Sequence, residues 1–294
     1  MITLPLVDIY YALLLLDACF IIMTVCVLLA STVPSLKVLL KYGKTLQKRD
    51  LNTNLSRILG FLYVPKSFFK HFYAIDLIFS LTNLYILKDG SGKYLQLKDT
   101  DVVISGSVKI SRHQFHIVTS MMVLQSFRRV YECFYVSKFS TTAKIHLSHY
   151  LVGYFFYMGV NLEPLLCYLL GTKSDTADIS SASRIHPLDF LAVTLFSLAS
   201  IDQYRNHLYL SRLVKYNVPR QLLFMYLSCP HYLDEIIIYF SCFLVLRTPE
   251  SFLVFTWTLV NLSCSANQSY QYYIKKSEQL RERGHYWRIL PYIY

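Results

Sequence analysis

Several common signatures of nucleotide and metal binding are missing from this sequence. It has no GxGxxG, Walker A or HExxH motif, and only 9 of its 294 residues are glycine. A Rossmann domain needs its glycine-rich turn to bring the backbone against a pyrophosphate, so that fold is excluded as the holder of a nucleotide. A phosphorylated cofactor would have to bind among helix ends and basic loops.

Charged residues are few, and the cysteines lack the spacing that is typical of metal sites. Only 16% of the residues are charged, whereas soluble domains average about 25%. The 7 cysteines show no CxxC spacing, and most fall in apolar segments, where cysteine is usually a small buried residue. We therefore predict neither a disulfide framework nor a zinc site. His231, Asp234 and Glu235 share one helix end without a partner motif, so we expect no metal there.

Long apolar segments are abundant. Hydrophobic residues make up 54% of the chain, and apolar runs near 20 residues recur, which is the length that crosses the hydrocarbon core of a bilayer. We predict an all-α integral membrane protein with about seven transmembrane helices in a single domain, residues 1–294. The expected spans are residues 9–30, 72–87, 114–135, 145–170, 188–209, 232–247 and 251–273.

Basic residues are unevenly distributed between the predicted loops. Most of the 29 Lys and Arg residues lie in the first, third and fifth loops and in the C-terminal tail. Because loops rich in Lys and Arg stay in the cytosol, we predict a cytosolic C-terminus and a luminal N-terminus. The same distribution argues against nucleic acid as the partner of the net charge of +11. The glycosylation-type triplets at Asn54, Asn261 and Asn267 are then expected to be unused.

Two polar pairs stand out between residues 201 and 239. Gln203 and His207 are four residues apart, as are His231 and Glu235, so each pair shares one face of a helix. In the predicted topology both pairs lie at cytosolic helix ends and flank a basic loop. The alternative is that the pairs lie on the solvent-exposed face of a helix at the membrane surface. Polar side chains at membrane depth are, however, energetically costly and tend to be functional. We interpret this stretch as a site for an anionic cofactor.

A second cluster of charge falls in the third predicted span. Arg129 and Glu132 are three residues apart and can pair, with Arg128 beside them. Glu132, Arg129 and Tyr131 are our candidates for polarising a substrate oxygen or delivering a proton. The alternative is an ion pair at a helix end whose long side chains reach the membrane surface. A third stretch, VPKSFFKHFY, is by itself typical of a basic-aromatic segment at a membrane surface.

A series of short motifs extends from residue 42 to the C-terminus, and each of them occurs once. They are YGKT at 42–45, VPKSFFKHFY at 64–73, QSFRRVYEC at 125–133, VSKFS at 136–140, QYRNH at 203–207, YLSCPHYLDE at 226–235 and the Pro-aromatic end. On these motifs the chain resembles the steroid 5α-reductase family. The Val-Pro-Lys and Arg-Arg-x-x-Glu-Cys pieces resemble its polyprenol reductase branch, since steroid-reducing members have other residues there.

The resemblance implies a seven-span, NADPH-dependent reductase of the endoplasmic reticulum membrane. Residues 1–140 would hold substrate-side motifs, and residues 186–294 would form the reductase region that binds NADPH. Carried over residue by residue, it implies cofactor contacts at Gln203, His207, Tyr216, His231, Glu235, Asn267 and Tyr273. The chain departs from the family pattern at three places: Tyr270 stands where the family has His, His231 where it has Asn, and Tyr286-Trp287 where its tail has an Arg-Lys pair. The implied substrate is a long polyprenyl lipid, whose α-isoprene double bond is saturated on the route to dolichol for protein N-glycosylation.

Chemistry constrains which form of that substrate is reduced. An isolated alkene is a poor hydride acceptor, whereas an α,β-unsaturated aldehyde spreads the developing charge onto its oxygen. We therefore expect polyprenal, formed from polyprenol, to accept the hydride. Reduction of a steroid or of a trans-2-enoyl-CoA is the alternative within the family. Outside it, the alternatives are a membrane methyltransferase that uses S-adenosylmethionine and a non-catalytic scaffold.

Overall fold

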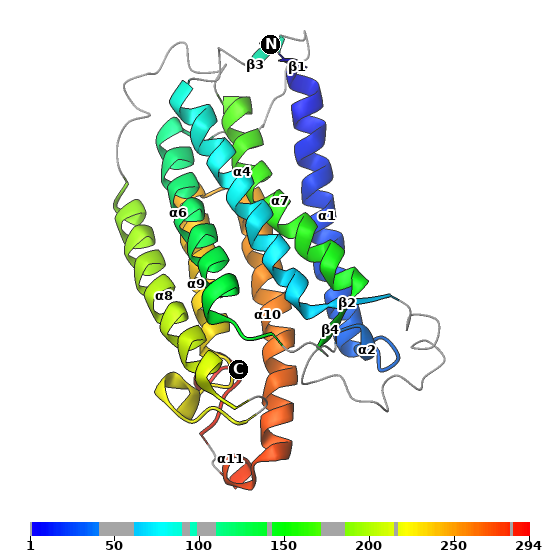
Figure 1. Cartoon of the computed structure of the whole chain (residues 1–294). Helices are drawn as coiled ribbons and strands as arrows, with labels where there is room; N and C mark the ends of the chain where they lie inside the picture. The colour runs from blue at the N-terminus through cyan, green and yellow to red at the C-terminus, as the bar shows by residue number, and fades with distance from the viewer. Residues whose placement is uncertain are drawn as a thin grey trace.

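Long helices account for most of the structure. The computed structural model describes residues 2–40, 62–89, 95–98, 110–139, 143–171, 186–214, 217–282 and 285–294. Within these residues the helices run roughly side by side as an elongated bundle, with the N-terminus at one end and the C-terminus towards the other (Figure 1). The predicted all-α class is confirmed.

Each predicted apolar segment coincides with one long helix. These helices are α1 (Leu6–Thr32), α4 (Phe69–Asp89), α6 (Arg112–Tyr131), α7 (Leu147–Gly171), α8 (Pro187–Arg212), α9 (Pro230–Leu246) and α10 (Pro249–Lys276). In the described part of the chain, α1 is the one helix long and apolar enough to be a candidate membrane span by length and composition. The number of crossings and the orientation of the termini therefore stay predictions.

Shorter elements connect the bundle. They are α2 (Lys37–Leu40), η3 (Lys66–Phe68), the π-helical turn η4 (Glu132–Val136), η5 (Leu222–Met225) and α11 (Glu278–Glu282). Strand β1 (Ile2–Pro5) pairs in parallel with β3 (Leu95–Lys98), and β2 (Tyr63–Pro65) pairs antiparallel with β4 (Lys144–His146). Because β2 leads into α4 and β4 into α7, the second ribbon fixes the starts of these two helices beside each other (Figure 1).

Local sequence explains where several helices begin. Pro187, Pro230 and Pro249 each occupy the first position of a helix, where the missing backbone N–H would have had no partner in any case. The Thr248 side chain caps α10 by accepting from the Ser251 backbone N–H at 3.1 Å. Pro230 places the start of α9 within the YLSCPHYLDE motif, so that the last six residues of the motif are helical.

The interior of the bundle is partly polar, and much of its outer surface is apolar. Asp76 on α4 is fully buried and accepts from the Asn161 side chain of α7 at 2.7 Å. Large apolar side chains such as Leu15, Phe190 and Leu198 are instead more than half exposed. Helices that face lipid show this arrangement, because their polar groups turn towards the bundle interior.

Candidate active site

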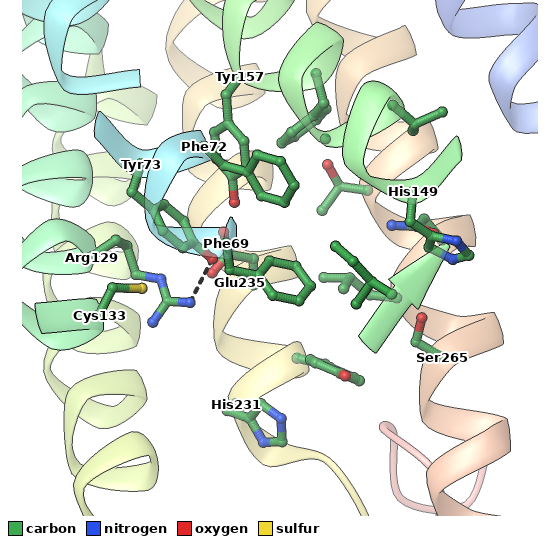
Figure 2. A pocket seen from close by; sticks show the side chains of 18 of the residues that line it. Phe69, Phe72, Tyr73, Arg129, Cys133, His149, Tyr157, His231, Glu235 and Ser265 are labelled. Atoms are coloured by element: carbon green, nitrogen blue, oxygen red, sulfur yellow. Dashed lines mark hydrogen bonds between the residues drawn. The ribbon is translucent and has the colours of Figure 1, made fainter. Parts of the chain in front are cut away.

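A cavity of about 320 Å³ lies among six of the long helices. It is bounded by the C-terminal ends of α6 and α8, the N-terminal ends of α4, α7 and α9, and the middle of α10 (Figure 2). The predicted topology places these helix ends on the cytosolic side. Concave pockets of this kind are where cofactors and small substrates bind.

The cavity has two different walls. The polar wall is formed by Tyr73, Arg129, Gln203, His207, His231 and Glu235. The remaining lining is mostly apolar, and the apolar residues called the aromatic wall below are Phe69, Phe72, Ile145, Val152, Phe156, Trp257 and Leu262. His149, Thr258, Asn261 and Ser265 lie among them in the lining. Lys66 on η3 also lines the cavity, and burial lowers the pKa of its ammonium group. One site therefore offers both hydrogen-bonding groups and an apolar surface.

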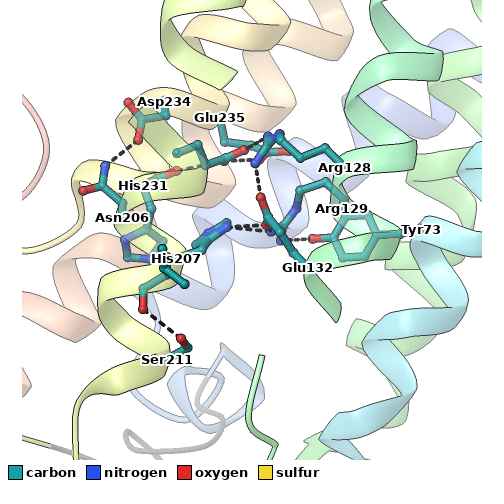
Figure 3. Close-up of polar contacts among 12 residues, drawn as sticks. Tyr73, Arg128, Arg129, Glu132, Asn206, His207, Ser211, His231, Asp234 and Glu235 are labelled. Atoms are coloured by element: carbon teal, nitrogen blue, oxygen red, sulfur yellow. Dashed lines mark hydrogen bonds and ion pairs between the residues drawn. The ribbon is translucent and has the colours of Figure 1, made fainter. Parts of the chain in front are cut away.

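A buried carboxylate organises the charged side chains next to the polar wall. Glu132 has no exposed surface and accepts hydrogen bonds from both Arg128 and Arg129 (Figure 3). His207 Nδ1 lies 2.6 Å from a Glu132 oxygen and 2.7 Å from Arg129 Nη1. Glu132 opens the π-helical turn η4, an irregularity that is often found at functional sites. The cluster joins α6 to α8.

A second set of contacts joins α8 to α9. Gln203 Nε2 donates to a carboxylate oxygen of Glu235 and to the backbone oxygen of His231, the latter at 3.1 Å. Arg128 donates to the side-chain oxygens of Gln125, at 2.7 Å, and of Gln203. The two polar pairs predicted from their spacing are thus connected through these hydrogen bonds.

Tyr73 is a cavity residue that the sequence argument did not single out. Arg129 Nη2 donates to the Tyr73 hydroxyl at 2.6 Å, and the guanidinium carbon lies 4.5 Å from the centre of the tyrosine ring (Figure 3). On its other side, Tyr73 is hydrogen-bonded to Tyr157 of α7. Tyr73 belongs to the VPKSFFKHFY motif, so the motif pointed to it, but no local pattern pointed to Tyr157.

Five predicted site residues meet at the cavity. Gln203 and His207 reach it from α8, His231 and Glu235 from α9, and Arg129 from α6. Two of the predicted catalytic residues do not line it. Glu132 lies behind Arg129 and His207, and Tyr131 is nearly half exposed. A direct role for Tyr131 has no support from its position, because α6 turns this side chain away from Arg129.

The predicted cofactor contacts on α10 lie on other faces of that helix. Thr258, Asn261 and Ser265 line the cavity. Asn267 instead accepts a hydrogen bond from Arg288 Nε at 2.8 Å, and Tyr273 is buried in a cluster with Leu280 and Tyr286. Their cofactor contacts stay predictions.

Some predictions fall outside the described residues. These are Tyr216, the YGKT motif at 42–45, Lys215 of the basic loop and the triplet at Asn54. Arg212 and Arg220, which belong to the same basic loop, are exposed and do not line the cavity. Across the described ranges, no group of three or more His, Cys, Asp and Glu side chains could hold a metal ion.

Comparisons with known proteins agree with the motifs. Residues 173–294 match the family described as 3-oxo-5-alpha-steroid 4-dehydrogenase. The chain is 33% identical to the polyprenal reductase of Saccharomyces cerevisiae over 240 residues, which cover 81% of this chain and 79% of the relative. It is 30% identical to the polyprenal reductase of Drosophila melanogaster over 259 residues, covering 79% and 77%. Polyprenal reductase 1 of Arabidopsis thaliana is 26% identical over 266 residues, covering 79% and 82%.

Proposed function

The chain belongs to the steroid 5α-reductase family, in its polyprenal reductase branch, and from this premise we propose that it is an NADPH-dependent polyprenal reductase. Its reaction saturates the α-isoprene double bond on the route from polyprenol to dolichol. The observation that supports this proposal is one cavity in which Gln203, His207, His231 and Glu235 face an aromatic wall. The polar residues suit a nicotinamide cofactor, and the apolar wall suits an isoprenoid.

The polar wall has the donors and acceptors that the nicotinamide end of NADPH requires. Its carboxamide and ribose hydroxyls can be matched by the amide of Gln203, the carboxylate of Glu235 and the imidazole of His231. When bound, NADPH supplies the hydride, while the protein supplies position and electrostatics. A volume of about 320 Å³ is at the low end for ligand pockets, which suits the nicotinamide end and the substrate head rather than a whole dinucleotide.

The chain's own charged residues prepare the site for a developing negative charge. Arg129 lines the cavity, and we propose that its guanidinium places a positive charge close to the substrate oxygen. Glu132 holds Arg129 and His207 in place from behind the polar wall. The aromatic wall, with Phe69, Phe72 and Trp257 on it, would pack against the first isoprene units and exclude water.

The substrate chain itself need not enter the protein, because it is soluble in the bilayer. We propose that the seven long helices cross the endoplasmic reticulum membrane, with the N-terminus luminal and the C-terminus cytosolic. The distribution of Lys and Arg supports this orientation. The exposed apolar faces of α1 and α8 and the buried Asp76 on α4 support helices in lipid.

A lipid profile tests the proposed function in cells. Membranes that lack this protein are expected to accumulate polyprenol or polyprenal and to lose dolichol, and the wild-type chain is expected to restore the profile. A variant with Glu235→Ala is expected to restore it poorly, whereas a variant changed at the exposed Glu282 is expected to restore it fully. An unchanged ratio of polyprenol to dolichol in the deficient membranes would contradict the proposal.

A further inference from the structure

Reduction of an α,β-unsaturated aldehyde needs a hydrogen-bond donor at the aldehyde oxygen. This inference rests on the proposed function and asks which side chain that donor is. Glu132 is unsuited to direct contact with the substrate, because it has no exposed surface. It already accepts hydrogen bonds from Arg128 and Arg129, and His207 lies within hydrogen-bond distance of it. An ionised carboxylate is moreover an acceptor only.

Tyr73 lies where such a donor is required. Its side chain belongs to the polar wall of the cavity, beside Arg129 and close to Glu235 in the close-up view (Figure 2). Its neighbour Phe72 packs on Gly153 of α7, at the point where a Cβ atom would come within 2.8 Å of the ring. The ring of Tyr73 stands edge-on to that of Tyr157, with centroids 5.0 Å apart. These contacts fix the direction of the Tyr73 side chain.

The hydrogen bonds of Tyr73 leave its proton for a ligand. A guanidinium has no acceptor, so in the 2.6 Å contact with Arg129 the tyrosine oxygen must accept. The second partner is Tyr157, whose own O–H donates to the Tyr73 oxygen and occupies its other lone pair. In the part of the chain that the structure describes, no further partner takes the Tyr73 O–H. We propose that Tyr73 donates this hydrogen bond to the aldehyde oxygen of polyprenal.

The proposed step balances. Bound NADPH would supply a hydride to the β-carbon; the electron pair of the C=C bond would then move towards the carbonyl, and negative charge would collect on the aldehyde oxygen. The Tyr73 O–H stabilises this enolate by its hydrogen bond. The α-carbon then takes a proton from water, the C=O bond re-forms, and Tyr73 keeps its own proton. The product is the saturated aldehyde, with one hydride and one proton added.

Arg129 is a positioning residue in this arrangement. Its Nη2 donates to Tyr73, while its Nη1 is held by Glu132 and lies 2.7 Å from His207. The guanidinium therefore polarises the phenol and makes it a stronger donor, since a hydrogen bond beside a charged group is stronger than a neutral one. Glu132 acts through Arg129.

The test uses the full-length protein, purified in detergent, with polyprenal and NADPH. Tyr73→Phe removes the hydroxyl and keeps the ring. It is expected to lower single-turnover hydride transfer by about 10²- to 10³-fold, the usual loss for one such donor. NADPH affinity and the thermal unfolding midpoint should stay close to wild type. The matched control is Tyr85→Phe on the same helix, a residue that is 53% exposed and about 18 Å further along the helix axis.

Three outcomes separate the possibilities. Near-normal turnover of Tyr73→Phe, with wild type active, would overturn the role of Tyr73 alone. A wild-type protein that does not reduce polyprenal would instead refute the proposed function. If Tyr73→Phe binds NADPH poorly, a trifluorinated tyrosine at position 73 keeps the shape and makes the phenol more acidic. The pH profile of hydride transfer should then shift to lower pH, and an unshifted profile would overturn the proposal.

Discussion

Glu132 shows how much one buried charge depends on its partners. The carboxylate is completely buried between two guanidinium groups, with His207 within hydrogen-bond distance. Removal of one partner from a buried charged cluster is far more damaging than the net strength of the cluster would indicate, because the remaining charges stay buried and unpaired. Glu132 is therefore important even though it does not touch the cavity.

Glu132→Gln is expected to destabilise the protein by about 3–5 kcal/mol, the usual cost of breaking a buried ion pair. It is also expected to lower turnover with polyprenal by about 10²-fold, because Arg129 and His207 lose their common anchor. Chemical unfolding and single-turnover kinetics measure the two effects. The matched control is Glu282→Gln, an exposed glutamate on α11. A stable and fully active Glu132→Gln variant would mean that the charged cluster contributes neither to folding stability nor to turnover.

A change at Glu235 tests whether the polar wall of the cavity binds the cofactor. It accepts from Gln203 and lies within hydrogen-bond reach of Gln125, and its side chain lines the cavity. Glu235→Ala is expected to weaken NADPH binding by at least about tenfold, since an unsatisfied buried partner costs about 1–3 kcal/mol. Fluorescence titration with NADPH measures the affinity, and the unfolding midpoint controls for folding. Unchanged affinity would make the Gln203–Glu235 pair purely structural.

Local spacing was a good guide to some site residues and no guide to others. Gln203 and His207 were accessible to prediction because residues four apart on a helix must share a face. Tyr157 was not, because its contact with Tyr73 joins two helices 84 positions apart. Tyr131 does not line the cavity, and its role stays a prediction: the motif indicates a functional segment, but only packing decides which of its side chains faces the cavity.

Among the elements, helix positions were largely predictable and their ends were not. The apolar runs located the long helices, but α4 begins at Phe69 rather than near residue 72. The aromatic side chains of its first turn continue the helix because they pack against α7, where Phe72 meets Tyr150 and Tyr157. Such packing between helices has no signature in the local sequence. The π-helical turn at Glu132 was missed on the same grounds.

The contact between α4 and α7 yields a prediction. Gly153→Ala would place a Cβ atom 2.8 Å from the Phe72 ring, and that ring is held by neighbouring tyrosines. Overpacking of this kind costs about 1–3 kcal/mol. We expect lower stability and a raised KM for polyprenal, since Phe72 and Gly153 both line the cavity.

Gly159→Ala is the matched control for that change. It lies on the same helix and would approach the Phe20 ring at 3.0 Å, but Gly159 does not line the cavity. Its expected effect is a loss of stability with an unchanged KM. Both variants are measured at a temperature where they are folded. Equal KM values would contradict the prediction, because they would mean that the α4–α7 contact does not affect substrate binding.

For the whole molecule, the distribution of Lys and Arg predicts the topology. In sealed microsomes, protease added outside is expected to remove an epitope tag at the C-terminus and to cut the basic loop between the first and second spans. A sequon inserted before Leu6 is expected to be glycosylated, because the N-terminus is proposed to be luminal. Glycosylation at Asn54, which lies outside the described residues, would contradict the proposed orientation.

The whole-molecule account depends on one reaction, so the most direct test is turnover by the purified protein. Full-length protein is incubated with NADPH and either polyprenal or polyprenol, without an oxidising partner, and the products are identified by mass spectrometry. The account predicts that polyprenal is converted to the α-saturated aldehyde, with NADPH strongly preferred over NADH, and that polyprenol is left unchanged. Saturation of polyprenol itself, or no reduction of polyprenal, would contradict it.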